Sequence, residues 1–434
     1  MLKRKAITKI EQWQASYRDK ALLLTGARQV GKTTAVREFA KRHYTHFIEI
    51  NFVKHPIAQQ AFDGTLDTDT IVTNLSAMGF GPFVDGETLV FFDEIQECPK
   101  ARTAIKFLVE EHRYDYIESG SLLGINYKPV PSYPVGYEME LPMYPLDFEE
   151  FLWAKNIQDN VVNQLREAYE NERPVSQFIH EQISNYYRQY LVVGGMPEVV
   201  QTFVETPDFG KVLEIQRSIL TTYRADITNY AGRRQANVKR VFDAVPSELG
   251  KEDKRFVLAN IETGATSRKY EDPTQWLVDA GIVYYSINTR EFSLPFTAVE
   301  NRRLYKLYMV DTGLLSNALL KGIQFNVLNG EIDINAGALT ENFVACALSA
   351  NGHSLHYFDR KSRQELDFII NEDNRISIIE VKSGTDYKRH ASLDAARENY
   401  ADRIARSIVL CRGNVEKDSV KNVLYLPLYM AIFI

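Results

Sequence analysis

Short apolar runs alternate with amphipathic stretches over the first 120 residues of the chain. Runs of this length, bounded by polar or glycine-rich turns, predict buried strands, and the apolar spacing between them predicts helices. The predicted strands are Ala21–Thr25, His46–Phe52, Thr88–Asp93 and Tyr114–Glu118. The predicted helices are residues 1–20, Thr33–Lys41 and Ala101–His112. This alternation predicts an α/β fold with a parallel sheet covered by helices on both faces.

The pattern changes after about residue 125, where prolines punctuate a loop-rich stretch. Helical periodicity then dominates from Phe148 to about Ala280, and α/β character returns from Gly337. Strands are predicted there at His353–Phe358, Glu365–Ile370, Ser377–Lys382 and Ser407–Cys411. These changes predict three parts with boundaries near 150 and 330, namely residues 1–150, 151–330 and 331–434.

Composition places the chain among ordinary globular proteins, with 45% hydrophobic and 25% charged residues and a net charge of −6. That charge gives no whole-chain argument for nucleic-acid binding, although a local basic surface stays open. The three cysteines are far apart, which argues against a disulfide framework and fits a reducing compartment. No apolar run reaches the roughly 20 residues that a membrane span needs. A cytoplasmic protein with no membrane partner is therefore expected.

A phosphate-binding motif lies between the first predicted strand and the helix after it. Residues 26–33 match GxxxxGK[ST] at every fixed position. Glycines let backbone N–H groups turn toward phosphate oxygens, and the following helix N-terminus adds partial positive charge. Lys32 is predicted to reach the β- and γ-phosphates, and the Thr33 hydroxyl is a predicted Mg²⁺ ligand. The predicted nucleotide-binding residues are Gly26, Ala27, Arg28, Gln29, Val30, Gly31, Lys32, Thr33 and Thr34.

Two acidic residues end a buried strand about 60 residues further on. Asp93 is predicted to hold Mg²⁺ through water, and Glu94 to polarise the attacking water. A water-activating carboxylate at this place favours a hydrolase over a small-molecule kinase. The next strand ends in Ser119-Gly120-Ser121, and either Ser119 or Ser121 is expected to contact the γ-phosphate.

These motifs and several later ones resemble a prokaryotic family of AAA-like P-loop ATPases. The resemblance rests on GARQVGKTT, FFDEIQECP, SGSLLG, YPLDFEEFL, YLVVGGMPE, YKLYMVDTGLL, GALTENFV and ELDFII…IIEVKSG, which occur in this order over nearly the whole chain. It implies an AAA-type core that binds ATP and Mg²⁺, a helical or winged-helix middle, and a C-terminal domain similar to PD-(D/E)xK nucleases. It implies no settled biological role.

Residues 236–290 have the pattern of a winged helix, with helices at Asn237–Val245 and Ser267–Ala280 and a strand beginning at Gly281. The stretch from Thr228 to Arg240 has no acidic residue and carries Arg233, Arg234, Lys239 and Arg240, and the second helix starts with Arg268 and Lys269. Such a group is able to neutralise several DNA phosphates, but winged helices also mediate protein contacts. Both kinds of partner stay open.

The C-terminal part resembles the D…ExK core of restriction-type nucleases. Asp367 lies on one predicted strand, and Glu380 and Lys382 share one face of the next. With Glu341 from the preceding helix, these carboxylates are candidate ligands for a second Mg²⁺ or for Mn²⁺. Lys382 would then orient or deprotonate the attacking water. Leu366 stands where such nucleases often have proline, and an inactive nuclease-like domain is the alternative.

The preferred hypothesis is an ATPase that hydrolyses ATP with Mg²⁺ and couples nucleotide state to the winged-helix and nuclease-like parts, with DNA as one candidate partner. The alternative is a nucleotide-dependent switch or interaction protein. A protein partner, a homo-oligomer and the identity of an arginine finger stay open.

Overall fold

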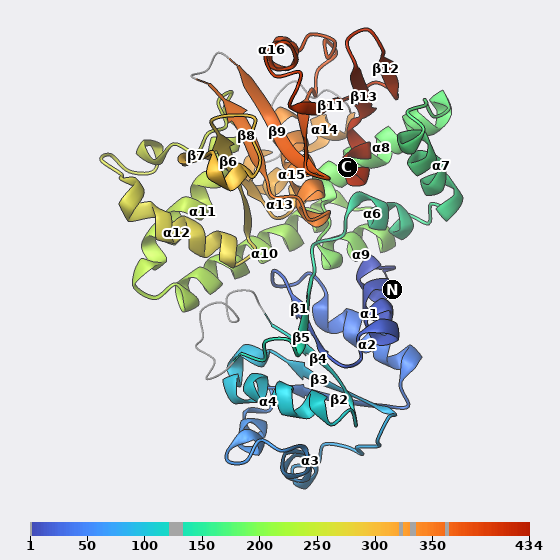
Figure 1. Ribbon diagram of the computed structural model, residues 1–434, viewed down its shortest axis with the longest axis vertical. Coiled ribbons are helices and arrows are strands. Elements are labelled where there is room, and N and C mark those ends of the chain that lie inside the picture. The colour runs from blue at the N-terminus through green and yellow to red at the C-terminus, as the bar shows by residue number, and fades with distance from the viewer. Residues whose placement is uncertain (1, 121–132, 321–323, 330–335, 361–363) are drawn as a thin grey trace. The chain divides into compact units, whose positions relative to one another are not determined.

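The computed structural model describes residues 2–120, 133–320, 324–329, 336–360 and 364–434. The chain divides into two compact units (Figure 1). Residues 3–144, together with 279–281, form the N-terminal unit, and residues 145–278 and 282–434 form most of the C-terminal unit. Ser121 belongs to the predicted nucleotide site but lies outside the described residues.

The N-terminal unit is built on a five-stranded sheet in the order β2-β3-β4-β1-β5. Its strands are β1 (Ala21–Thr25), β2 (His46–Asn51), β3 (Thr88–Asp93), β4 (Asp115–Ser119) and β5 (Glu138–Pro142). All four pairings are parallel, so the carboxyl ends of the strands lie at one edge of the sheet. The predicted parallel sheet is confirmed, and β5 is a strand that the sequence did not predict.

Helices cover both faces of this sheet. They are α1 (Lys5–Ser16), α2 (Lys32–His43), α3 (Thr68–Ala77) and α4 (Pro99–Glu110). Alternation along each strand sends successive side chains to opposite faces. Thus Leu23, Val90 and Phe92 pack in one apolar cluster with residues of α3 and α4. The helices α1 and α2 pack against each other, and α2 contacts β3 and β4.

The C-terminal unit begins with a run of helices. They are α6 (Phe148–Ala154), α7 (Asp159–Glu170), α8 (Gln177–Val193), α9 (Pro197–Glu205), α10 (Phe209–Tyr230), α11 (Gln235–Leu249) and α12 (Ser267–Asp279), and two strands separate α12 from α13 (Thr312–Leu320). Later helices are α14 (Gln324–Asn329), α15 (Ala336–Ala350) and α16 (Ala391–Asn399). A capping box starts α6, because Asp147 accepts from the Glu150 amide at 2.9 Å while Glu150 accepts from the Asp147 amide at 3.1 Å. None of the helices within the described ranges is long and apolar enough to cross a membrane.

An eight-stranded sheet forms the rest of this unit, in the order β12-β13-β11-β10-β9-β8-β6-β7. Its strands are β6 (Val283–Thr289), β7 (Glu300–Met309), β8 (His356–Asp359), β9 (Glu365–Glu372), β10 (Arg375–Val381), β11 (Ile404–Cys411), β12 (Glu416–Asp418) and β13 (Val423–Pro427). The β6–β7 hairpin follows α11 and α12, as in the predicted winged helix. However, β6 also pairs in parallel with β8, so the hairpin continues into the C-terminal sheet. A separate winged-helix domain is therefore not confirmed.

The three cysteines are free thiols. Cys98 and Cys411 are buried, and Cys346 is half-buried. Burial raises the pKa of Cys98 to about 11 and that of Cys411 to about 12, and it also raises the pKa of Cys346. All three are therefore protonated and weakly nucleophilic near neutral pH.

Candidate functional site

The predicted phosphate loop connects the end of β1 to the start of α2. Its backbone needs glycine at both ends, because Gly26 has φ 140° and Gly31, which caps α2, has φ 93°. A Cβ atom at Gly26 would lie 2.2 Å from the carbonyl oxygen of Met143. The loop is therefore packed directly against the backbone that follows β5, and only glycine fits at position 26.

Lys32 is the cation of this loop. Its Nζ donates to the carbonyl oxygens of Gly26 and Ala27, each at 2.9 Å. Burial lowers its pKa to about 8, although the charges of Glu94 and Asp93 raise it. A buried ammonium whose bonds go to neutral carbonyl groups gains from an added anion, which is what a nucleotide phosphate supplies.

Asp93 lies at the centre of a hydrogen-bonded group formed by three adjacent strand ends. Asn51 of β2 and Ser119 of β4 are its direct neighbours in the parallel register. The Asn51 amide donates to Asp93 at 2.7 Å, and the Ser119 hydroxyl also donates to it. The Thr33 hydroxyl lies 3.3 Å from each carboxylate oxygen. The structure thus brings Thr33 and Asp93 together.

Glu94 follows Asp93 in a left-handed conformation, with φ 55° and ψ 47°. A glutamate seldom adopts this conformation, and such local strain is concentrated at functional sites. The Gln96 side-chain amide donates to the Glu94 carboxylate. Asn51 and Gln96 were missed by the sequence analysis. The sequence offers one signal for each, which is an amide side chain near the end of a strand. Asn51 ends β2, which pairs with β3, and Gln96 closely follows the end of β3.

The remaining residues of the loop differ in exposure. Ala27 and Val30 are buried, Arg28 is half-buried, and Gln29 and Thr34 are exposed. The Arg28 charge lies close enough to Lys32 to lower its pKa. The structure thus places Arg28 beside the phosphate loop's own cation.

The group around Asp93 fits a magnesium ion. Mg²⁺ prefers hard oxygen ligands and keeps several of its waters, so one or two protein oxygens are sufficient. Thr33 supplies a hydroxyl oxygen and Asp93 a carboxylate whose direction is fixed by Asn51 and Ser119. The chemistry of these donors therefore matches the predicted metal.

The predicted second metal site has a different composition, because a lysine lies within it. Lys306 of β7 is completely buried, with its Nζ 3.0 Å from Glu341, 2.9 Å from Glu365 and 3.9 Å from Asp367. Lys254 lies 2.7 Å from the other oxygen of Glu341. Burial alone would raise the pKa of Glu341, but the two ammonium groups lower it to about 2. The charge of Glu341 is therefore compensated by the protein's own cations.

Asp367, Glu380 and Lys382 do lie near one another. Asp367 accepts from the Val381 amide at 2.8 Å, and Lys382 lies 2.7 Å from Glu380. Burial, followed by the charges of Glu341 and Glu380, raises the pKa of Asp367 to about 7. Over the described part of the chain, however, no group of three or more His, Cys, Asp or Glu side chains is arranged to hold a metal ion. The expectation of a metal centre formed by Glu341, Asp367 and Glu380 therefore has no support in the described residues.

The predicted basic surface is partly neutralised as well. Arg234 lies 2.7 Å from Asp272, and Arg240 and Lys269 both pair with Glu262. Surface ion pairs of this kind reduce the positive potential available to DNA phosphates.

Comparison with protein families assigns the three parts of the chain separately. Residues 18–152 match an AAA domain. Residues 184–324 match a domain of unknown function, DUF8612, and residues 336–430 match another, DUF4143. No curated protein matches the chain. The nuclease-like character of the C-terminal part is not confirmed by these matches.

Solved structures show only distant likeness. A Walker-type ATPase of Pyrococcus abyssi is 15% identical, with 73% of this chain and 96% of that chain covered and a TM-score of 0.46. Orc1 of Aeropyrum pernix in complex with DNA is 13% identical, with coverages of 76% and 94% and a TM-score of 0.28. A RuvB mutant of Thermotoga maritima is 15% identical, with coverages of 65% and 89% and a TM-score of 0.31. On the family match and its own site geometry, residues 18–152 form a P-loop domain that is similar to AAA domains.

Proposed function

We propose that the chain binds ATP with Mg²⁺ at residues 26–34 and hydrolyses it. The observation that carries this proposal is the junction of Thr33, Asp93 and Glu94 beside the phosphate loop. Backbone N–H groups of the loop and Lys32 bind the phosphates, and Thr33 and Asp93 hold the metal, which offsets the negative charge of the phosphates. Glu94 accepts the proton of the attacking water, and Gln96 holds its carboxylate in place.

The experiment is ATP hydrolysis by the native chain and by Glu94→Gln. Loss of the general base should reduce turnover roughly 100-fold or more, while ATP affinity stays within a few-fold of native. Glu87→Gln is the matched control, because Glu87 is an exposed acid that immediately precedes β3. Hydrolysis that continues unchanged in Glu94→Gln would remove this residue from the mechanism.

We further propose that nucleotide state is coupled to the C-terminal unit. Arg4 supports this coupling, because it donates to the Val30 carbonyl of the phosphate loop at 2.8 Å and to the Tyr144 carbonyl at 2.7 Å. Tyr144 is the last residue before the chain continues into the C-terminal unit. Adding duplex or single-stranded DNA to the hydrolysis assay tests DNA as the coupled partner. Stimulation of ATP hydrolysis that weakens as the salt concentration rises would support DNA in this role.

A second candidate function has its own observation. The buried ammonium of Lys306 between Glu341, Glu365 and Asp367 favours a nuclease-like domain that has no metal and does not cleave. The protein would then act as a nucleotide-dependent switch. With no nucleotide present, this hypothesis predicts that Mn²⁺ leaves the Tm of the native chain and of Asp367→Asn unchanged. Saturable stabilisation by Mn²⁺ that is lost in Asp367→Asn would instead support a metal centre.

A further inference from the structure

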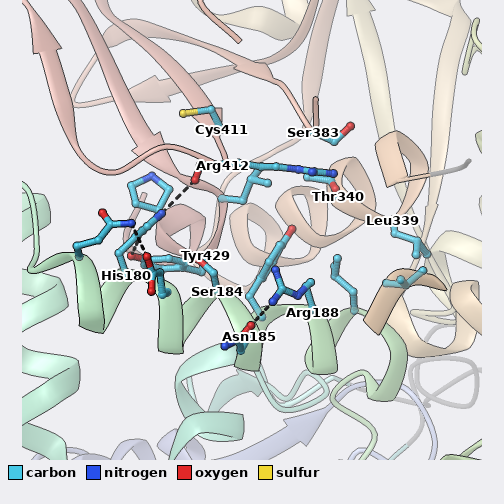
Figure 2. A pocket seen from close by; sticks show the side chains of 17 residues that line it. His180, Ser184, Asn185, Arg188, Leu339, Thr340, Ser383, Cys411, Arg412 and Tyr429 are labelled. Atoms are coloured by element: carbon cyan, nitrogen blue, oxygen red, sulfur yellow. Dashed lines mark hydrogen bonds between the residues drawn. The ribbon is translucent and has the colours of Figure 1, made fainter. Parts of the chain in front are cut away.

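A cavity of about 420 Å³ lies in the C-terminal unit, and its lining includes none of the residues predicted to bind ATP or metal (Figure 2). Strands β10, β11 and β13 run parallel to one another, so their carboxyl ends lie at one edge of the sheet. Ser383, Arg412 and Pro427, which end these strands or follow them closely, all line the cavity, and α8 forms the facing wall. In open α/β sheets ligands bind outside the carboxyl ends of parallel strands, and this volume is within the usual range for small-molecule sites.

Two guanidinium groups belong to this cavity. Figure 2 shows Arg188 rising from α8 beside Asn185, to which it donates a hydrogen bond, and Arg412 extending from the end of β11 toward Thr340. Burial, and then the charge of Arg412, lowers the pKa of Arg188. The two cations are thus close enough to repel each other, and an anion between them would turn that repulsion into attraction.

His180 supports the cavity wall without adding charge. Its ring nitrogens lie 3.0 Å from the Tyr429 hydroxyl and 3.1 Å from the Arg412 carbonyl oxygen. Burial lowers its pKa, so the ring is neutral near pH 7. Glu181 is the acid among the lining residues. Two arginines against one glutamate leave the lining with a net positive charge.

The rest of the lining is both apolar and polar. Leu191, Leu339 and Leu428 offer apolar surface, and Ser184, Thr340 and Ser383 offer hydroxyl groups. A few polar groups converging in a mostly apolar pocket is the usual composition of a site for a small organic molecule. An inorganic ion alone would leave the apolar part of this cavity unused.

We propose that this cavity binds a small organic anion, whose phosphoryl or carboxylate group lies between Arg188 and Arg412 and whose apolar part lies against the leucines. Guanidinium groups bind both kinds of anion through paired N–H donors. The proposal does not depend on the ATP site, because all the lining residues belong to the C-terminal unit.

Calorimetric titration of the full chain tests the proposal, with phenyl phosphate, benzoate and inorganic phosphate as probes. Lys32→Ala serves as the background, so that the phosphate loop does not compete for the probes. We expect phenyl phosphate or benzoate to bind more tightly than inorganic phosphate, and the tighter of the two identifies the anion class. Each of Arg188→Gln and Arg412→Gln should weaken that binding by about 10-fold or more, since a charge-assisted bond is lost.

Two further variants make the result decisive. Arg217→Gln, at an exposed position of α10, is the matched control and should bind as the background does. Ser184→Phe keeps both guanidinium groups but fills the cavity, so it should abolish binding even if an arginine variant folds poorly. Two outcomes would overturn the proposal. One is equal affinity in all variants. The other is no saturable binding at about 10 mM probe, a concentration well above the micromolar to millimolar dissociation constants of ordinary ligands.

Discussion

Gly26, which has no side chain, determines the geometry of the phosphate loop. At Gly26 the backbone has φ 140°, and the Met143 carbonyl oxygen occupies the space that a Cβ atom would need. The sequence motif already requires glycine here, because the motif is local and its chemistry is known. It does not reveal the contact with Met143, which is 117 residues away in the chain and depends on the unpredicted strand β5.

Gly26→Ala should therefore weaken both folding and ATP binding. Overpacking against a backbone atom and a strained φ together should destabilise the N-terminal unit by on the order of 3 kcal/mol. Gly64→Ala is the matched control, because Gly64 also has a positive φ, 109°, but has no atom within 4 Å of the added Cβ. Thermal unfolding and ATP titration measure both effects. Equal losses in the two variants would show that φ, and not the Met143 contact, sets the requirement.

The partners of Asp93 also depend on contacts between segments that are distant in the sequence. The sequence predicted Asp93 and Thr33 from motif spacing, but it did not predict Asn51. That residue becomes a partner only because Asn51 and Asp93 are direct neighbours in the β2–β3 register. Register is decided by the packing of both strands in the sheet, which no single segment specifies.

At the scale of elements, one ionic cluster joins β7, β9 and α15. Lys306 comes from β7, Glu365 and Asp367 from β9, and Glu341 from α15. The sequence predicted that the carboxylates would converge, from strand alternation and the nuclease resemblance. It could not predict Lys306, because in the run Leu304–Met309 a lysine between apolar residues is indistinguishable from an exposed one on an edge strand.

Asp367→Asn should stabilise the protein above neutral pH. The folded-state pKa of Asp367 is about 7, raised by burial and by Glu341 and Glu380. Its contribution to stability is therefore complete below the ordinary pKa of about 4 and is lost as the pH rises through about 7. At pH 8 the variant should be more stable than the native chain by on the order of 1–3 kcal/mol, and the difference should shrink toward pH 4.

Urea unfolding at several pH values measures this difference. Asparagine keeps an oxygen to accept from the Val381 amide, so that bond is not lost in the variant. Asp373→Asn, in the exposed turn after β9, is the control and should show no such dependence on pH. A native chain that is more stable than Asp367→Asn at pH 8 would mean that the carboxylate is ionised and well compensated.

At the scale of the whole molecule, the C-terminal sheet extends across the sequence boundary predicted near residue 330. The predicted boundary lies where the helical periodicity of the sequence ends and α/β character begins. However, β6 and β7 precede this boundary and belong to the same sheet as the strands that follow it. Pairing between β6 and β8 joins segments about 70 residues apart, which no local pattern reports. The change near 150, by contrast, lies close to the end of the compact N-terminal unit at residue 144.

A fragment of residues 331–434 should therefore fold poorly, whereas residues 145–434 should fold. The shorter fragment lacks β6 and β7, which leaves an edge of β8 unpaired. It also lacks Lys254 and Lys306, so Glu341 would be buried without a cation, at a cost of roughly 3–5 kcal/mol. Circular dichroism and urea unfolding of the two fragments provide the test. Cooperative unfolding of the shorter fragment, with a midpoint similar to that of the longer one, would contradict this view of the sheet.

The three protonated thiols make the chain a suitable background for site-specific labelling. Cys98 and Cys411 are shielded from reagents, and all three have raised pKa values, so each should react slowly with maleimides near pH 7. A cysteine introduced at an exposed position of each unit, such as Lys100 and Arg217, would then carry nearly all of the dye. Energy transfer between the two dyes would follow the separation of the units when ATP is added, without removal of any native cysteine.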